Sequence, residues 1–214
     1  MPSRHCSGAV LAGGASRRFG GGRKGLALVG GQRVVDRVLG ALGSITDEQM
    51  LIANDRLIRD AVLTVCSHGD VRTERGSIVG LHSALTHCRE AVLVVAWDMP
   101  FVSAALLAEL RRKGEALDSA IIPEGVRGPE PLCAYYPRSC LSIIDRQIEE
   151  GAMRLVDLIE ALPDHTILSR SRVERFGSPD RLFANVNTAD DLATAQRIGM
   201  TEVVVQPCSN VELV

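Results

Sequence analysis

One run of the chain, residues 91–96, is apolar at six consecutive positions. The run, AVLVVA, is far too short to cross a membrane and is rich in the β-branched residues that favour strands. A strand that is apolar at both odd and even positions must be covered on both faces, which is typical of the centre of a parallel sheet. Asp98 ends the apolar stretch and so stands at the carboxyl end of the strand. The run therefore predicts an α/β fold with helices on both faces of a mainly parallel sheet.

Strand-like and helix-like segments alternate along the rest of the chain, as this fold class requires. We expect strands at residues 8–12, 50–52, 63–65, 119–122, 132–136 and 183–187. We expect helices at residues 34–42, 81–88, 104–112 and 190–197, and a helical stretch from residue 139 that is interrupted at Gly151. Thr188 is expected to cap the last helix. The sequence contains no linker, so we expect a single domain at residues 1–200, followed by a C-terminal tail at residues 201–214.

Composition argues against several classes of protein. The 214 residues are 46% hydrophobic and 23% charged, which is ordinary for a folded, water-soluble domain. A net charge of −2 and an aromatic content of 3% provide no basic surface and few stacking platforms, so nucleic acid is not an expected partner. The first residues lack the apolar region of a signal peptide, and we expect a cytoplasmic protein without membrane contact. The six cysteines are scattered without a C-x-x-C pair, which argues against a zinc site.

The segment after the first expected strand concentrates glycines and cations. From Leu11 to Lys24 it reads LAGGASRRFGGGRK. Paired glycines let backbone N–H groups approach a ligand, and four cationic side chains in one loop repel each other unless a polyanion lies between them. A solvated surface loop is the alternative interpretation. The segment lacks both the Gly-Lys-Ser/Thr of a Walker loop and the G-x-G-x-x-G of a dinucleotide fold, so neither of these motifs explains it.

The same segment resembles the signature L-A-G-G-x-S-x-R-M-G-x-x-K of nucleotidyltransferases with a Rossmann-like fold, with Phe19 in place of the usual methionine. From residue 8 to about residue 197, the chain is similar to the molybdenum cofactor guanylyltransferase family. Later points of similarity are RGSIVG at residues 75–80, WDMP at 97–100 (C-D-x-P in the family), PLCA at 131–134 and NVNT at 185–188. The last motif favours guanylyl transfer, because cytidylyltransferases that act on the same pterin usually show a D-I-D-T type of sequence there.

The resemblance implies an enzyme that transfers GMP from GTP to the phosphate of molybdopterin and releases pyrophosphate. It implies that the nucleotide contacts Leu11, Ala12, Gly13, Gly14, Lys24, Asn54, Asp70 and Asp98. Asn54 and Asp70 match the family only after a shift of one or two residues, and an Asx turn in a loop is an equal alternative for each.

On the pterin side, the resemblance points to Asn185, Asn187 and Arg154. The two asparagines are two residues apart on an expected strand and so would face the same way, although bonding to nearby backbone is the alternative. Arg154 follows Gly151, and a solvated arginine on a helix is its alternative interpretation. A molybdoenzyme or its chaperone would receive the product.

The chemistry that the resemblance implies needs charge stabilisation more than a general base, because a phosphate nucleophile is already ionised at neutral pH. Asp98 at the carboxyl edge of the sheet is the expected ligand of Mg²⁺, which prefers oxygen donors and also takes phosphate oxygens. A helix cap before Pro100 is the alternative for Asp98. The expected catalytic residues are Arg17, Arg18, Lys24 and Asp98.

Other functions stay open from the residues alone. CTP as the nucleotide, or a sugar 1-phosphate as the acceptor, would use the same loop. A nucleotide-binding sensor without catalysis is an alternative from another class, although such a protein could dispense with the metal ligand Asp98.

Overall fold

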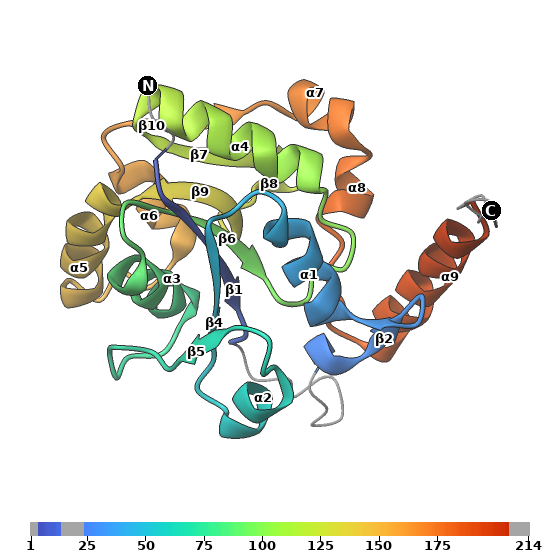
Figure 1. The fold of residues 1–214 in the computed structure, drawn as a ribbon. Helices are drawn as coiled ribbons and strands as arrows, with labels where there is room; N and C mark the ends of the chain where they lie inside the picture. Colours follow the sequence, from blue (N-terminus) through green and yellow to red (C-terminus); the bar gives the residue numbers. More distant parts are fainter. Residues whose placement is uncertain (1–3, 14–23, 206–214) are drawn as a thin grey trace, which may run out of the picture.

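A computed structural model describes residues 4–13 and 24–205 of the chain. Eight strands of this part form one sheet, with β6 (Ala91–Ala96) and β1 (Cys6–Leu11) side by side at its centre (Figure 1). Across the sheet, the order is β10 (His165–Leu168), β7 (Ala120–Gly125), β9 (Cys133–Pro137), β6, β1, β4 (Glu48–Ile52) and β5 (Cys66–His68). The short β8 (Gly128–Pro129) pairs with β7.

The sheet is mainly parallel. β1 runs parallel to β4 and β6, β4 to β5, and β7 to β10. β9 is antiparallel to both of its neighbours, β6 and β7, and β8 is antiparallel to β7. The predicted fold class, an α/β fold with a mainly parallel sheet, is confirmed.

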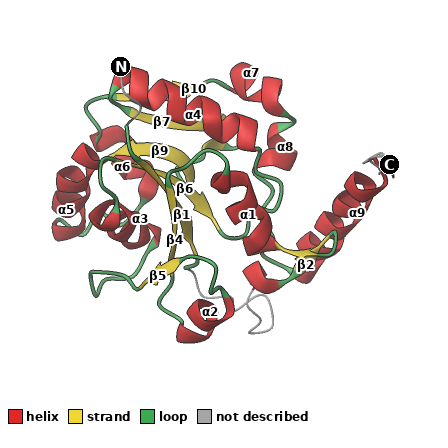
Figure 2. Ribbon diagram, viewed as in Figure 1, coloured by secondary structure: helices red, strands yellow, loops and turns green. Residues whose placement is uncertain are grey.

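The central strand is buried on both faces, as its composition predicts. Ala91, Leu93 and Val95 of β6 pack into one apolar cluster, and Val92 and Val94 pack into another on the opposite face. The first cluster includes residues of α1 (Val34–Gly43) and α4 (Ala104–Leu117), and the second includes residues of α3 (Ser77–His87), α5 (Leu141–Glu149) and α6 (Leu155–Ala161). Figure 2 shows these helices on both sides of the strands.

A smaller unit lies to one side of the sheet. The hairpin of β2 (Leu28–Val29) and β3 (Gln32–Arg33) packs against α9 (Ala189–Val205), which extends away from the rest of the molecule (Figure 1). Its small apolar cluster joins Val29, Val34, Phe101, Val186 and Ala195. Because Phe101 and Val186 belong to the loops beside the end of β6, this cluster connects the hairpin and α9 to that edge of the sheet.

The remaining described helices are short. They are α2 (Arg56–Ala61), α7 (Arg170–Val173), α8 (Pro179–Leu182), and the 3₁₀ turns η2 (Lys24–Leu26), η3 (Arg138–Cys140) and η4 (Glu174–Phe176). The expected interruption at Gly151 separates α5 from α6. Several helices are longer than predicted: α3 begins at Ser77, α4 continues to Leu117 and α9 continues to Val205.

Two expected strands are wrong. Residues 63–65 form a turn, with the Leu63 side chain 83% exposed, and the strand comes at residues 66–68, where the chain meets β4. Residues 183–187 form a turn and an irregular segment, because Val186 N–H donates to the Asp98 carbonyl (2.9 Å) where a strand would need a sheet partner.

The predicted cap of the last helix is confirmed. Thr188 Oγ1 accepts a hydrogen bond from Asp191 N–H (3.1 Å), and the Asp191 carboxylate accepts one from Thr188 N–H (2.8 Å). This reciprocal pair closes the first turn of α9. Among the described residues, no helix is long and apolar enough to span a bilayer.

Candidate nucleotide-transfer site

The carboxyl ends of four parallel strands bring distant loops to one edge of the sheet. Backbone hydrogen bonds continue past the ends of the strands: Ala12 N–H donates to Ile52 O (2.8 Å), Ala53 N–H to His68 O (2.8 Å) and Trp97 N–H to Leu11 O (3.2 Å). These bonds hold the residues after β1, β4, β5 and β6 at this edge. Open α/β sheets bind ligands at the carboxyl edge, so this is where the predicted site residues should converge.

Lys24, Asp98 and Asn187 meet at this edge, although 163 residues separate the first from the last. The Lys24 ammonium forms an ion pair with the Asp98 carboxylate and donates a hydrogen bond to Asn187 Oδ1 (2.6 Å). The side chains of Lys24 and Asp98 are only 12% and 9% exposed, so the pair is shielded from solvent. Two side-chain oxygens therefore converge on one cationic nitrogen.

Asp98 is held in place by the backbone on both sides. It follows Trp97 directly after β6, and its carbonyl accepts the hydrogen bond from Val186 N–H described above. The alternative of a helix cap does not hold, since the N-cap of the next helix is Ser103, whose hydroxyl accepts from Leu106 N–H (3.5 Å). The carboxylate is thus available at the edge of the sheet.

The structure also brings Asn54 and Asp70 together. Asn54 Nδ2–H donates to Asp70 Oδ2 (2.5 Å), and Asp70 N–H donates to Asn54 Oδ1 (2.8 Å). A Cβ on Gly80 would lie 3.5 Å from the Leu11 side chain and 4.0 Å from Asp70 Oδ1, which places the pair beside the end of β1. Both residues thus belong to the carboxyl edge, and their contact with a nucleotide stays a prediction.

The end of β1 presents backbone to this edge. The side chains of Leu11 and Ala12 are buried, whereas Gly13 is exposed and, among the described residues, no atom lies within 4 Å of the position of a Cβ there. A ligand can therefore approach the Gly13 backbone closely, as the glycine pattern predicts. Gly14, Arg17 and Arg18 lie outside the described residues.

The three residues expected on the pterin side do not share one environment. Asn187 contacts Lys24, but Asn185 Nδ2–H donates to the nearby Phe183 carbonyl (3.2 Å), which is the local bonding given as its alternative. The expectation that the two face the same way on a strand is wrong, because the segment is irregular. Arg154 is exposed before α6, 3.9 Å from the carboxylate of Asp157.

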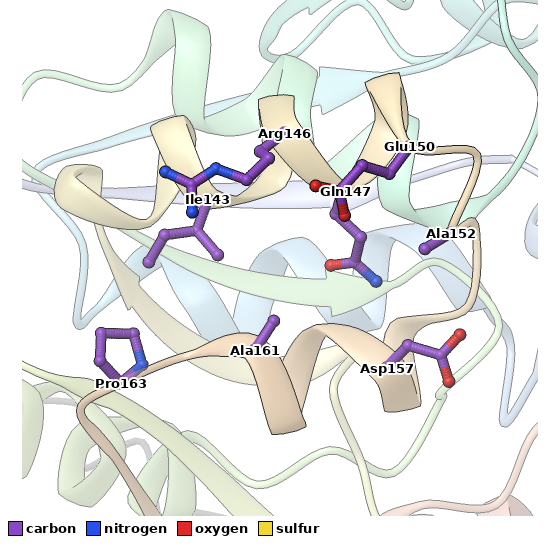
Figure 3. Close-up of a pocket in the computed structure, with 8 residues that line it drawn as sticks. All are labelled: Ile143, Arg146, Gln147, Glu150, Ala152, Asp157, Ala161 and Pro163. Atoms are coloured by element: carbon purple, nitrogen blue, oxygen red, sulfur yellow. The ribbon is translucent and has the colours of Figure 1, made fainter.

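Hollows also open in the surface of the described part of the chain. One, with a volume of about 630 Å³, lies between α5 and α6, and its lining residues, drawn in Figure 3, include none of the predicted site residues that the structure describes. A larger hollow of about 1010 Å³ is lined by Pro100 and Phe101, which follow Asp98 closely in the chain. The guanidinium carbons of Arg37 and Arg181 lie over the Phe101 ring in its wall, at 5.5 and 5.4 Å from the ring centroid.

The donor set fits a hard divalent cation bound together with a phosphate. Among the described residues there is no group of three or more His, Cys, Asp and Glu side chains that could hold a metal by itself. Asp98 Oδ2 and Asn187 Oδ1 both contact the Lys24 ammonium, so they already converge on a position of positive charge. Mg²⁺ commonly takes one or two protein oxygens and completes its shell with phosphate oxygens and water.

Two features of the site were not predicted from the sequence. One is the contact of Asn187 with Lys24, which no local pattern indicates. The other is the packing of Gly25 against the ring of Trp97, where a Cβ on the glycine would lie 2.2 Å from a ring carbon. The signals available were a glycine directly after the signature lysine and a tryptophan where the family has cysteine.

A glycine-ended first strand, a shielded lysine–aspartate pair and a mainly parallel sheet define an α/β enzyme that transfers nucleotidyl groups. The sequence model of the family described as MobA-like NTP transferase domain matches residues 8–166, and the chain belongs to this family. The molybdenum cofactor guanylyltransferase of Desulfosudis oleivorans is 36% identical over 195 residues, which cover 89% of this chain and 94% of the relative.

Solved structures agree with this assignment. Molybdopterin-guanine dinucleotide biosynthesis protein A from Archaeoglobus fulgidus superposes with a TM-score of 0.77 at 30% identity, covering 90% of this chain and 97% of that protein. 4-Diphosphocytidyl-2C-methyl-D-erythritol synthase from Anaerococcus prevotii superposes with a TM-score of 0.67 at 13% identity, covering 92% and 96%. The second similarity shows the fold alone.

Proposed function

We propose that this chain transfers GMP from GTP to the phosphate of molybdopterin, releases pyrophosphate and so forms the guanine dinucleotide of the cofactor. The observation that carries the proposal is the convergence of Lys24, Asp98 and Asn187 at the carboxyl edge, beside the glycine-ended strand. The similarity to curated guanylyltransferases over most of the chain supports it.

In the proposed reaction, an oxygen of the acceptor phosphate forms a bond to the α-phosphorus of GTP. The bond from that phosphorus to the β-phosphate oxygen breaks, and pyrophosphate leaves with the electron pair. The nucleophile is already ionised, so the protein has to align it and offset the charge that builds on the leaving group. Lys24 offers a shielded positive charge for the second task, and Arg17 and Arg18 of the signature are proposed to add theirs.

Asp98 and Asn187 are the residues that would hold Mg²⁺ with the triphosphate. The bound ion would supply positive charge to the phosphates and a template for their orientation. Lys24, which contacts both of these residues, would offer its positive charge to the phosphates. Before the substrate binds, the positive charge of Lys24 balances the negative charge of the Asp98 carboxylate, which lowers the free-energy cost of burying that charge.

Base recognition is proposed at Asn54 and Asp70. Guanine presents an N1–H and a 2-amino group as donors, whereas cytosine lacks this pair, so acceptors placed for guanine lose their partners when CTP enters. An acceptor that the bound base covers and leaves unpaired costs roughly 1–3 kcal/mol, and two such losses predict a preference for GTP of about 30-fold or more. We expect the Asp70 carboxylate to be one of the acceptors that distinguish GTP from CTP.

The acceptor is proposed to lie between Asn187 and the larger hollow at Phe101. The guanidinium groups of Arg37 and Arg181, which line this hollow, suit a ligand that carries a phosphate. A molybdoenzyme or its chaperone would then receive the product. The five described cysteines are unpaired, which agrees with a reducing compartment, and we place the reaction in the cytoplasm.

The test is the release of pyrophosphate from GTP and from CTP, each at equal concentration with molybdopterin and magnesium. We expect GTP to be preferred by about 30-fold or more. Asp70→Asn should lower this preference, whereas the matched control Asp60→Asn, at an exposed carboxylate on α2, should leave it unchanged. Equal rates with the two nucleotides, or a faster rate with CTP, would exclude guanylyl transfer and leave the family assignment intact.

Nucleotide binding and pyrophosphate release, measured separately, would distinguish the remaining alternative functions. Thermal shifts with GTP, CTP, ATP and UTP, with and without magnesium, rank the nucleotides by affinity because a ligand of the native state raises its Tm. A sugar-1-phosphate transferase would release pyrophosphate only with a sugar 1-phosphate as acceptor. A non-catalytic sensor would show a nucleotide-dependent shift and no pyrophosphate with any acceptor.

A further inference from the structure

Trp97 is the only tryptophan of the chain and stands directly before Asp98. Its side chain is 2% exposed, so the ring is part of the interior beneath the carboxyl edge. Its backbone N–H donates to the Leu11 carbonyl, the last residue of β1 (3.2 Å). The backbone of Trp97 therefore joins the end of the expected nucleotide strand to the expected metal ligand.

The ring forms the surface on which Gly25 sits. A Cβ at residue 25 would lie 2.2, 2.5 and 2.9 Å from three carbons of the indole, and no side chain of any kind fits there. Gly25 itself is buried, and Leu26 packs against the same apolar cluster as Trp97. The turn from Lys24 to Leu26 is thus seated directly on the indole ring.

The packing of Gly25 against the indole determines where the Lys24 ammonium lies. A lysine side chain has four flexible carbons, so its charge reaches a fixed point only if its backbone is fixed and its partners hold the far end. Asp98 and Asn187 hold the far end, and the indole beneath Gly25 holds the backbone. We propose that Trp97 is a positioning residue for Lys24 in guanylyl transfer, and this inference rests on the proposed function.

General packing does not explain this tryptophan. Its indole N–H is buried and has no hydrogen-bond partner in the described part of the chain. A buried donor without an acceptor destabilises the fold, and a leucine or phenylalanine would fill an apolar position without this penalty. What the indole adds is a broad flat face under a glycine, next to the reacting groups.

The test compares three variants by kcat and by the KM for GTP. Trp97→Leu removes the flat ring, and we expect kcat to fall roughly 10- to 100-fold, the range for a displaced catalytic group, with a smaller change in KM. Trp97→Phe keeps an aromatic face under Gly25 and should recover most of the lost rate. Tyr135→Leu is the matched control, because Tyr135 is also a buried ring beneath a glycine, Gly114, and its hydroxyl also has no partner among the described residues.

Tyr135 lies opposite Leu93 in the middle of β6, well before the carboxyl edge. We expect Tyr135→Leu to lower Tm as Trp97→Leu does but to keep kcat within about twofold of the wild type, since the lost packing is of the same kind. An equal loss of kcat in the two leucine variants would overturn the proposal, because packing alone would then explain both.

A double-mutant cycle tests whether Trp97 acts through Lys24. If it does, Trp97→Leu lowers kcat in the wild type and has almost no further effect in the Lys24→Ala background. Equal losses in both backgrounds would overturn the proposal. The close contact between residue 25 and the indole offers a second check. Gly25→Ala should strongly lower kcat, and combining it with Trp97→Leu should recover part of the rate because the smaller side chain leaves room for the new Cβ.

Tryptophan fluorescence separates this inference from the proposed function. Because Trp97 is the only tryptophan, any indole signal comes from the site. Titration with magnesium and GTP should change the emission of the wild type in a saturable way, and Lys24→Ala should reduce that change. Absence of guanylyl transfer in the wild type would overturn the proposed function alone. An emission change that is identical in the wild type and Lys24→Ala would overturn the coupling of Trp97 to Lys24.

Discussion

Replacing Asp98 with asparagine separates the chemistry of the site from the stability of the fold. The amide keeps the shape of the side chain and still accepts a hydrogen bond from Lys24, but the charge is lost. Both side chains are about nine-tenths buried, so the substitution leaves the Lys24 ammonium shielded without its counter-charge, and removing one partner of a buried ion pair typically costs about 3–5 kcal/mol. The hydrogen bond that the amide keeps offsets part of this cost, so we expect the free energy of unfolding to fall by about 3 kcal/mol.

A loss of this size lowers Tm by about 6–12 °C for a chain of this length, so turnover is measured well below the Tm of the variant. Turnover should then fall for a separate reason, since removing one group that stabilises transition-state charge typically costs about 100- to 1000-fold in kcat. GTP binding should remain measurable, because the backbone at Gly13 and the Asn54–Asp70 pair are unchanged. The variant should thus be folded, able to bind nucleotide and almost inactive.

The assay is magnesium-dependent release of pyrophosphate from GTP, with calorimetry for Tm and a thermal shift for GTP. Asp47→Asn is the control, because Asp47 is ion-paired with Arg111 (3.0 Å) and accepts from Cys6 N–H (2.8 Å) at the opposite end of β1. It should lose stability and keep full activity. If Asp98→Asn turns over GTP within about threefold of the wild type, the reasoning that places the metal at this carboxylate is refuted.

Three further predictions concern groups away from the reacting centre. Burial raises the pKa of Glu130, so its stabilising contribution is fully present below the unfolded-state pKa and is lost as pH rises through the folded-state pKa. The urea midpoint of Glu130→Gln should therefore exceed that of the wild type by a margin that grows from pH 4 to 8. A difference that does not depend on pH would contradict this. Gly114→Ala would place a Cβ 2.1 Å from the Tyr135 ring. The destabilisation from overpacking, about 1–3 kcal/mol, should exceed the gain in helix propensity of at most about 1 kcal/mol. A Tm equal to or above that of the wild type would refute the close approach. Cys66 is exposed, whereas burial raises the pKa of the Cys6, Cys88 and Cys140 thiols to about 12, 11 and 12. Mass spectrometry after brief alkylation of the native protein should therefore find Cys66 modified well before those three.

Local patterns in the sequence determined much of the fold. The uninterrupted apolar run of β6 required cover on both faces, and α1 and α3 lie on opposite faces of it. The Thr188 cap followed from the preference of a hydroxyl for the first turn of a helix. Such features depend on neighbours within a few residues, so a single sequence suffices to predict them.

Where the local pattern was ambiguous, the sheet decided. Leu63, Thr64 and Val65 have the composition of a strand, yet pairing with β4 begins at Cys66 and leaves Leu63 in the solvent. The segment at Asn185 lacks a strand partner at its edge, so its backbone bonds to the loop after β6. Strand formation needs a partner with a matching register, and that information does not reside in the segment itself.

The sequence by itself determined which residues are expected to carry the chemistry: the glycine after the first strand, Lys24 thirteen places after Leu11 at the start of the signature loop, and Asp98 after the central strand. Only the tertiary structure decided that Asn187 joins them and that Gly25 must be a glycine because of Trp97. The physical reason is that parallel strands place their carboxyl ends together only once their order is set, with β1 between β4 and β6. Hydrogen bonds and close packing between residues so far apart in the chain exist only after that order has formed.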